Sequence, residues 1–252
     1  MRNRHLGKED KLVVETYESS SRAKFTYTSE TEPHVFDLSR ISVELKCKND
    51  KQKTLKQSIE NNDITIATGP AGTGKTWVAL VTALKLMKAY PTKYTKIRLV
   101  KSLQVIQGEE VGFLKGSLSE KLEPYMLSFT DILDEVLGDE NYTRLMMESK
   151  QVEILPLAYV RGRTNKRCIV IVDESQNMNM HTFRTILTRI GEDCKMVFLG
   201  DIEQIDRKDH ANSCLSKVSE IFENIDYVGS ITFTDEESVR NPLIPELLKA
   251  LR

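Results

Sequence analysis

The stretch GPAGTGKT, residues 69–76, constrains this chain more than any other feature of the sequence. It fits the pattern G-x-x-x-x-G-K-[ST], with Gly69, Gly74, Lys75 and Thr76 at the fixed positions. Glycines let the backbone turn so that successive N–H groups face one anion, and the start of a helix adds its positive dipole end. The pattern predicts a phosphate-binding loop between a strand and a helix. A glycine-rich turn without a ligand is the alternative.

Each position of this loop has a predicted role. Lys75 is expected to bridge the β- and γ-phosphates of ATP, and Thr76 is expected to offer its hydroxyl to Mg²⁺. The predicted nucleotide-binding residues of the loop are Gly69, Pro70, Ala71, Gly72, Thr73, Gly74, Lys75 and Thr76. ATP and Mg²⁺ are therefore the expected cofactors.

Short apolar runs alternate with segments of helical periodicity along the chain. Residues 63–68 form a β-rich run before the loop, and residues 75–89 carry apolar side chains at helical intervals after it. Further runs are apolar along most of their length, as strands covered on both faces are: residues 96–101, 151–157, 168–173, 195–200 and 230–234. Helical segments are expected at residues 117–138, 179–191 and 213–225. This order predicts an α/β fold with a mostly parallel sheet, helices on both faces and functional loops at the carboxyl ends of the strands.

Length and composition limit the other possibilities. A chain of 252 residues can bury a full core, and we expect a domain at residues 51–252 preceded by an N-terminal extension or arm at residues 1–50. The formal net charge of −1 gives no global basic field, so nucleic acid would need a local patch. No apolar stretch approaches the roughly 20 residues of a membrane span, and no signal-peptide core begins the chain. We therefore expect a cytoplasmic protein with no membrane partner. The four cysteines lack metal-ligand spacing, so we expect no zinc site.

Two carboxylates end the run at residues 168–173. Asp173 and Glu174 would repel each other, and a bound metal ion gives a reason for placing both at a strand tip. We expect Asp173 to hold Mg²⁺ and Glu174 to orient or deprotonate the attacking water. A solvated turn is the alternative. Gln204, which follows the next strand, is the expected sensor of the γ-phosphate.

Four blocks in order, GPAGTGKT, LAYVRGRT, VDESQN and GDIEQID, resemble the PhoH-like family of P-loop ATPases, which are related to superfamily 1 helicases. The resemblance covers about residues 51–252 and extends to GEEVGFLKG, SEKLEPYM, LTRIG and SVRNP. It implies a RecA-like core, Mg²⁺-dependent ATP hydrolysis and action on RNA or single-stranded DNA, with helicase or translocase activity. A nucleotide-gated binding module with incidental turnover is the alternative function.

The resemblance also assigns residues outside the loop and marks where this chain departs. It implies that Gln52 reads the adenine base, with Gln57 as a rival for that role. Lys101-Ser102 stands where the family commonly has Arg-Pro, and Asn241 stands where it often has histidine. Contacts carried over to those positions are therefore in doubt.

Arginine and lysine residues suggest two kinds of partner. Superfamily 1 helicases use two RecA-like lobes, whereas this chain has room for one, which leaves one side of the γ-phosphate without an arginine. We therefore expect a head-to-tail homo-oligomer, such as a hexameric ring, in which Arg240 of one chain reaches the ATP of the next. Arg161 and Arg163 are rivals for that role.

The basic cluster at residues 161–167 is the main candidate for nucleic acid. Its members are Arg161, Arg163, Lys166 and Arg167. Such a cluster can neutralise phosphates. It is also typical of a solvated loop, and no aromatic residues are interleaved to form a stacking platform.

Overall fold

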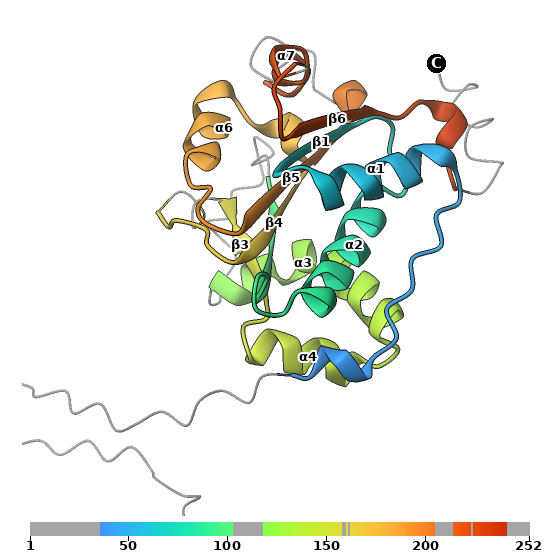
Figure 1. The fold of residues 1–252 in the computed structure, drawn as a ribbon, viewed down its shortest axis with the longest axis vertical. Coiled ribbons are helices and arrows are strands. Elements are labelled where there is room, and N and C mark those ends of the chain that lie inside the picture. Colours follow the sequence, from blue (N-terminus) through green and yellow to red (C-terminus); the bar gives the residue numbers. More distant parts are fainter. Residues whose placement is uncertain are drawn as a thin grey trace, which may run out of the picture. The chain divides into compact units, whose positions relative to one another are not determined.

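A computed structural model of the chain describes residues 36–102, 118–157, 160, 162–204, 214–222 and 224–240. Its sheet has six strands in the order β3-β2-β4-β5-β1-β6 (Figure 1). The strands are β1 (Ile64–Thr68), β2 (Lys96–Lys101), β3 (Val152–Pro156), β4 (Cys168–Asp173), β5 (Cys194–Gly200) and β6 (Val228–Thr232). Each neighbouring pair is parallel, so the carboxyl ends of the strands meet at one edge of the sheet.

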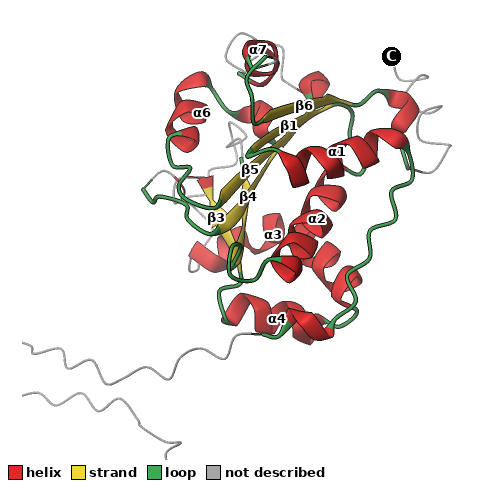
Figure 2. Ribbon diagram, viewed as in Figure 1, coloured by secondary structure: helices red, strands yellow, loops and turns green. Residues whose placement is uncertain are grey.

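Helices cover both faces of this sheet (Figure 2). The helices are α1 (Asp50–Asn61), α2 (Lys75–Ala89), α3 (Leu118–Leu137), α4 (Glu140–Glu148), α6 (Met180–Leu187) and α7 (Leu215–Ile221). On β4, Ile169 and Ile171 join the core shared with α1, α2, α3 and α4, whereas Val170 and Val172 join the core shared with α6 and α7. Because side chains alternate along a strand, a strand covered on both faces reads as a continuous apolar run. The predicted α/β fold with a doubly covered parallel sheet is confirmed.

Helix α2 begins directly at the predicted loop. Gly74 precedes it with φ 81°, a left-handed conformation that suits glycine, and no side chain caps the first turn. The uncapped N–H groups of that turn are left for an anion. The helix itself is anchored by apolar side chains that are fully buried, including Val78, Leu80, Val81 and Leu84. The core therefore fixes the loop at the carboxyl edge of the sheet.

Residues 36–49, which the sequence places in the N-terminal extension, contact the domain. Leu38 and Val43 are buried, and the rings of Phe36 and Tyr142 have centroids 5.2 Å apart. The Gln151 side chain accepts from the Phe36 N–H at 2.7 Å and donates to the Phe36 carbonyl at 3.0 Å. The boundary at residue 50 stays a prediction, because residues 1–35 lie outside the described part of the chain.

Among the described residues, no helix combines the length and the apolar character needed to cross a membrane.

Gly229→Ala is expected to lower the free energy of unfolding by about 1–3 kcal/mol, the usual cost of overpacking. A Cβ at Gly229 would lie 2.0 Å from Ser58 Oγ and 2.6 Å from Asn62 Nδ2, so both side chains would have to leave the positions in which Ser58 bonds to Thr65 and Asn62 bonds to Ser58. Urea unfolding measures the change. Gly162→Ala is the matched control, because a Cβ there meets nothing within 4 Å. Equal stability of the two variants would contradict the close packing of α1 on β6.

Candidate active site

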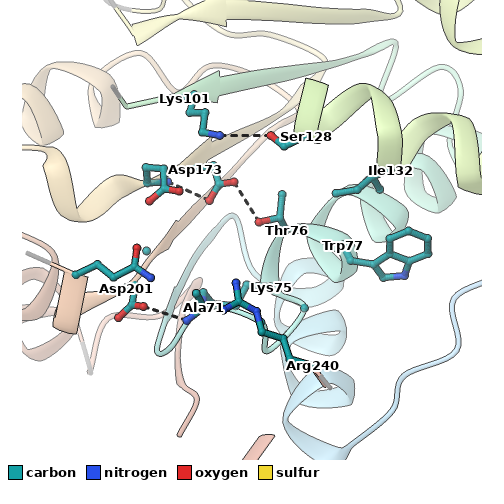
Figure 3. A pocket seen from close by; sticks show the side chains of 15 residues that line it. Ala71, Lys75, Thr76, Trp77, Lys101, Ser128, Ile132, Asp173, Asp201 and Arg240 are labelled. Atoms are coloured by element: carbon teal, nitrogen blue, oxygen red, sulfur yellow. Dashed lines mark hydrogen bonds between the residues drawn. The ribbon is translucent and has the colours of Figure 1, made fainter. Parts of the chain in front are cut away.

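A cavity of about 310 Å³ opens at the carboxyl edge of the sheet, above the predicted loop (Figure 3). Its size falls within the range of small-molecule sites. The loop and the start of α2 form one side, and the ends of β2, β4 and β5 form another. The residues that line it are Ala71, Gly72, Gly74, Lys75, Thr76, Trp77, Lys101, Ser128, Ile132, Asp173, Glu174, Gly200, Asp201, Gln204 and Arg240.

The side chain of Lys75, the first residue of α2, lies against the loop. Its Nζ donates to the carbonyls of Gly69 and Pro70, both at 2.8 Å, and to Thr73 Oγ1 at 3.2 Å. Burial lowers the pKa of Lys75, and the nearby Asp201, Asp173 and Glu174 carboxylates oppose that shift. The ammonium group is thus held by the loop's own oxygens at the place where a phosphate would offer stronger, charged acceptors.

Thr76 and Asp173 meet across the cavity. Thr76 Oγ1 donates to Asp173 Oδ2 at 3.1 Å, which brings a hydroxyl and a carboxylate oxygen together. Burial, and next the charge of Glu174, raise the pKa of Asp173. Adjacent oxygen donors in a site that disfavours a bare negative charge fit Mg²⁺, which prefers oxygen ligands and would offset that charge. Among the described residues, no three His, Cys, Asp or Glu side chains are placed so that they could hold a metal ion together, so water and phosphate would complete the coordination.

Glu174 follows Asp173 in the left-handed conformation, with φ 55°, which is uncommon for a residue other than glycine. Its carboxylate lines the cavity and accepts from Gln176 Nε2 at 2.7 Å. The backbone N–H of Glu174 donates to Asp173 Oδ1 at 3.0 Å. The strand end thus separates the two carboxylates, so that Asp173 faces Thr76 while Glu174 is held by an amide.

Gln204 and Arg240 both line the cavity. Gln204 ends a short 3₁₀ helix (Ile202–Gln204) after β5, a position compatible with the expected contact to a γ-phosphate. Arg240 crosses the loop of its own chain so closely that a Cβ at Gly72 would lie 2.4 Å from its side chain. In this single chain Arg240 lies beside its own loop, and the expectation that it reaches the ATP of a neighbouring chain stays a prediction. The backbone explains this position, because the Val239 N–H donates to the Gly72 carbonyl at 2.9 Å.

Gln52, the expected adenine-reading residue, lies behind the loop and does not line the cavity. Its Nε2 donates to the Thr73 carbonyl at 2.9 Å, and its Oε1 accepts from the Lys48 N–H at 2.8 Å. Both ends of the amide are therefore bonded to the protein, and Gln52 supports the loop from α1. Its rival Gln57 is exposed on α1 and does not line the cavity either.

Comparison with known proteins gives the family. The PhoH family, described as PhoH-like protein, matches residues 44–252. The chain belongs to the PhoH-like family. This confirms the resemblance seen in the motifs and, with the sheet order, the RecA-like P-loop core expected from it.

Relatives within the family are similar over most of this chain. A PhoH-like protein of Bacillus subtilis (strain 168) is 39% identical over 215 residues, covering 83% of this chain and 66% of that protein. Protein PhoH of Escherichia coli (strain K12) is 37% identical over 215 residues, covering 84% of this chain and 59% of that protein. The chain thus spans about two thirds or less of the length of these relatives.

Among solved structures, the large terminase of a thermophilic bacteriophage has a TM-score of 0.46 at 12% identity, covering 80% of this chain and 50% of that chain. The helicase domain of Pyrococcus furiosus Hef has a TM-score of 0.42 at 11% identity, covering 72% of this chain and 38% of that chain.

In this family member the basic candidates lie far from the cavity. Arg163, Lys166 and Arg167 are exposed and precede β4, whereas the cavity is formed where β4 ends. Arg167 donates from Nε to the Thr92 carbonyl at 2.9 Å, so one of the three contributes to the fold. Arg161 lies outside the described residues. The candidates therefore mark a surface at the opposite edge of the sheet, separate from the cavity.

Sequence reasoning assigned no role to several residues that complete the cavity. Lys101 ends β2 opposite Asp173 in the sheet register, and its Nζ donates to Ser128 Oγ at 3.4 Å. Trp77 and Ile132 form an apolar wall beside Thr76 (Figure 3). Lys101 could have been predicted to lie at the site, because it is the last residue of the predicted strand at residues 96–101. Ser128 and Ile132 reach the site only because α3 packs beside α2, which no local motif indicates.

Proposed function

We propose that the chain is a Mg²⁺-dependent ATPase whose turnover is coupled to RNA or single-stranded DNA. One observation supports the hydrolytic part most directly. The ammonium group of Lys75, the Thr76–Asp173 oxygen pair and the Glu174 carboxylate line one cavity above uncapped helix N–H groups. These are the groups that phosphoryl transfer to water requires, and they come from separate parts of the sequence.

The residues divide the chemistry between them. The loop amides and Lys75 hold the β- and γ-phosphates and offset their charge. Thr76 and Asp173 would hold Mg²⁺, which supplies further positive charge when bound. Glu174 orients a water molecule and takes its proton as the water oxygen bonds to the γ-phosphorus. The bond from that phosphorus to the bridging oxygen breaks, and ADP and phosphate are released.

The nucleic-acid part of the proposal is supported by the exposed basic residues before β4. Arg163 and Lys166 project from a loop that is held in place by Asn165, which is fully buried and bridges to Ile190. Cations on an anchored loop can contact successive phosphates of a strand, and such contacts weaken as salt rises. The helicase or translocase activity implied by the family would use the same surface.

ATP turnover with and without single-stranded polymer tests this proposal. We expect RNA or single-stranded DNA to raise the rate several-fold, and we expect the stimulation to fall between about 50 mM and 200 mM salt, as phosphate contacts do. Arg163→Ala with Lys166→Ala should weaken the stimulation and leave the basal rate unchanged. A basal rate that no polymer changes would contradict the coupling.

An oligomer is also part of the proposal, because the described residues form one lobe around the cavity and superfamily 1 helicases use two. Light scattering on the same samples, with ATP and Mg²⁺ present, measures the number of chains. Full turnover at the mass of one chain, 28.8 kDa, would remove the oligomer and leave Arg240 of the same chain as the arginine of the site.

A nucleotide-gated switch is the second candidate, and one feature of the loop favours it. Lys75 Nζ and the Ala71 N–H are both bonded to groups of the protein, so a bound nucleotide has to displace these contacts. Binding alone would then change the loop. Slow turnover that is indifferent to polymer, together with tight ATP or ADP binding, would support the switch over the motor.

A further inference from the structure

Gln176 is a buried amide beside the cavity to which the proposed reaction gives no role. It lies in the 3₁₀ turn Ser175–Asn177 after β4 and is 3% exposed. Its Nε2 donates to Glu174 Oε2 at 2.7 Å, and its Oε1 accepts from the Asp201 N–H at 3.1 Å. One side chain thus joins the end of β4 to the end of β5.

These two bonds fix the orientation of the amide. A carboxylate can only accept and a backbone N–H can only donate, so a flipped amide would lose both bonds. The packing also holds it in place. A Cβ at Gly200 would lie 2.8 Å from Gln176 Oε1 and 3.0 Å from its backbone nitrogen, so only glycine leaves room for this arrangement.

The contact continues to the phosphate loop. Asp201 is 6% exposed, and its Oδ2 accepts from the Ala71 N–H at 3.0 Å (Figure 3). Hydrogen bonds therefore connect Glu174, Gln176, Asp201 and Ala71 in that order, from the carboxylate that faces the water to the loop that faces the phosphate. We name this series the amide relay.

We propose that Gln176 is a positioning residue that sets the position of the Glu174 carboxylate according to whether a phosphate occupies the phosphate loop. This inference rests on the proposed ATPase function. A phosphate in the loop competes for the Ala71 N–H and repels the Asp201 carboxylate, so Asp201 shifts. Its backbone N–H moves with it, and Gln176 passes the shift to Glu174. The water-activating group is then in place only when the loop is occupied.

Gln176→Met tests the relay, because methionine has a similar volume and can make neither bond. We expect kcat to fall about 10- to 100-fold, the scale of a lost hydrogen bond to a charged group. The KM and the affinity for ATP should change by less than about twofold, since Gln176 does not line the cavity. Gln176→Glu, which keeps an acceptor for Asp201 but repels Glu174, should also lower kcat.

A matched control separates positioning from loss of stability. Gln151 is likewise buried and bonded at both ends of its amide, to the backbone of Phe36, and is remote from the cavity. Both Gln151→Met and Gln176→Met should lower the melting temperature. Gln151→Met should leave kcat unchanged. A Gln176→Met kcat within twofold of the wild type would overturn the proposal.

A double-mutant cycle shows whether Gln176 acts through Glu174. In the Glu174→Gln background, single-turnover hydrolysis should be slowed no further by Gln176→Met. An equal loss in both backgrounds would mean that Gln176 acts on something other than Glu174, and the relay would be wrong.

Amide hydrogen exchange gives a readout that does not depend on turnover. In Gln176→Met the Asp201 N–H should exchange about 10-fold faster, because it has lost its acceptor. If the wild type binds ATP without hydrolysing it, the proposed function fails, and unchanged exchange of the Asp201 N–H in Gln176→Met would still overturn the relay by removing one of its bonds. If the wild type hydrolyses ATP but the cycle shows no coupling, the relay fails and the proposed function stands.

Discussion

Lys75→Ala is expected to abolish measurable ATP hydrolysis and to weaken ATP binding about 10- to 100-fold, the scale of lost hydrogen bonds to a charged group. Lys75 is 9% exposed, and its ammonium group lies against three oxygens of the loop, so alanine leaves no cation within the turn. The γ-phosphate would then develop its transition-state charge without this partner, which is expected to slow hydrolysis at least about 100-fold. Phosphate release and calorimetry measure the two effects.

Lys85→Ala is the matched control, because it removes the same charge from the same helix. It lies ten residues further along α2, or about 15 Å along the axis, and does not line the cavity. Its rate and affinity should equal those of the wild type. Hydrolysis by Lys75→Ala at a rate near that of the wild type would contradict the assignment of the loop.

Much of the fold could be predicted because its signals are local. β2, β4 and α2 begin and end where the sequence places them, since each is a short apolar run or a periodic segment bounded by polar residues. Helices α1 and α4 were missed as separate elements. Each buries only a narrow stripe of apolar side chains among polar residues, such as Leu55 and Ile59 in α1. A sequence with so few apolar residues reads as a loop until the surface that it packs against is known.

The candidate site likewise has residues that local signals predict and contacts that they do not. Lys75, Thr76, Asp173 and Glu174 were predicted because each ends or follows a strand whose carboxyl end meets the others at one edge. The support of the loop was not predictable. The bond from Gln52 to the Thr73 carbonyl depends on how α1 crosses the loop, a tertiary contact that no spacing encodes.

Arg240 is a second residue whose position could not be predicted. The sequence contains an arginine and the proposed reaction needs one, but the sequence does not show where the chain after β6 places it. The turn after β6 brings Val239 to the Gly72 carbonyl, and this backbone bond decides that Arg240 lies over its own loop. A sequence motif can therefore name a catalytic candidate while leaving open which chain it serves.

Glu174→Gln is expected to leave ATP bound but to slow hydrolysis about 10²- to 10⁴-fold, the range attributed to a general base. Glutamine keeps the size of the side chain, and its Oε1 can still accept from Gln176 Nε2, so the geometry of the site is preserved. What is lost is the ability to take a proton from water. Trp77, the single tryptophan of the chain, lines the cavity and can report ATP binding by its fluorescence.

The contrast between the two site variants is what assigns the roles. Lys75→Ala should lose both the Trp77 fluorescence change and turnover, whereas Glu174→Gln should keep the first and lose the second. Glu220→Gln, an exposed change of the same chemistry on α7, should keep both. If Glu174→Gln hydrolysed ATP as fast as the wild type, water would be activated elsewhere, and Asp173 could not replace Glu174 while it holds the metal ion. Binding without turnover in this one variant separates the water-activating carboxylate from the groups that hold the phosphates.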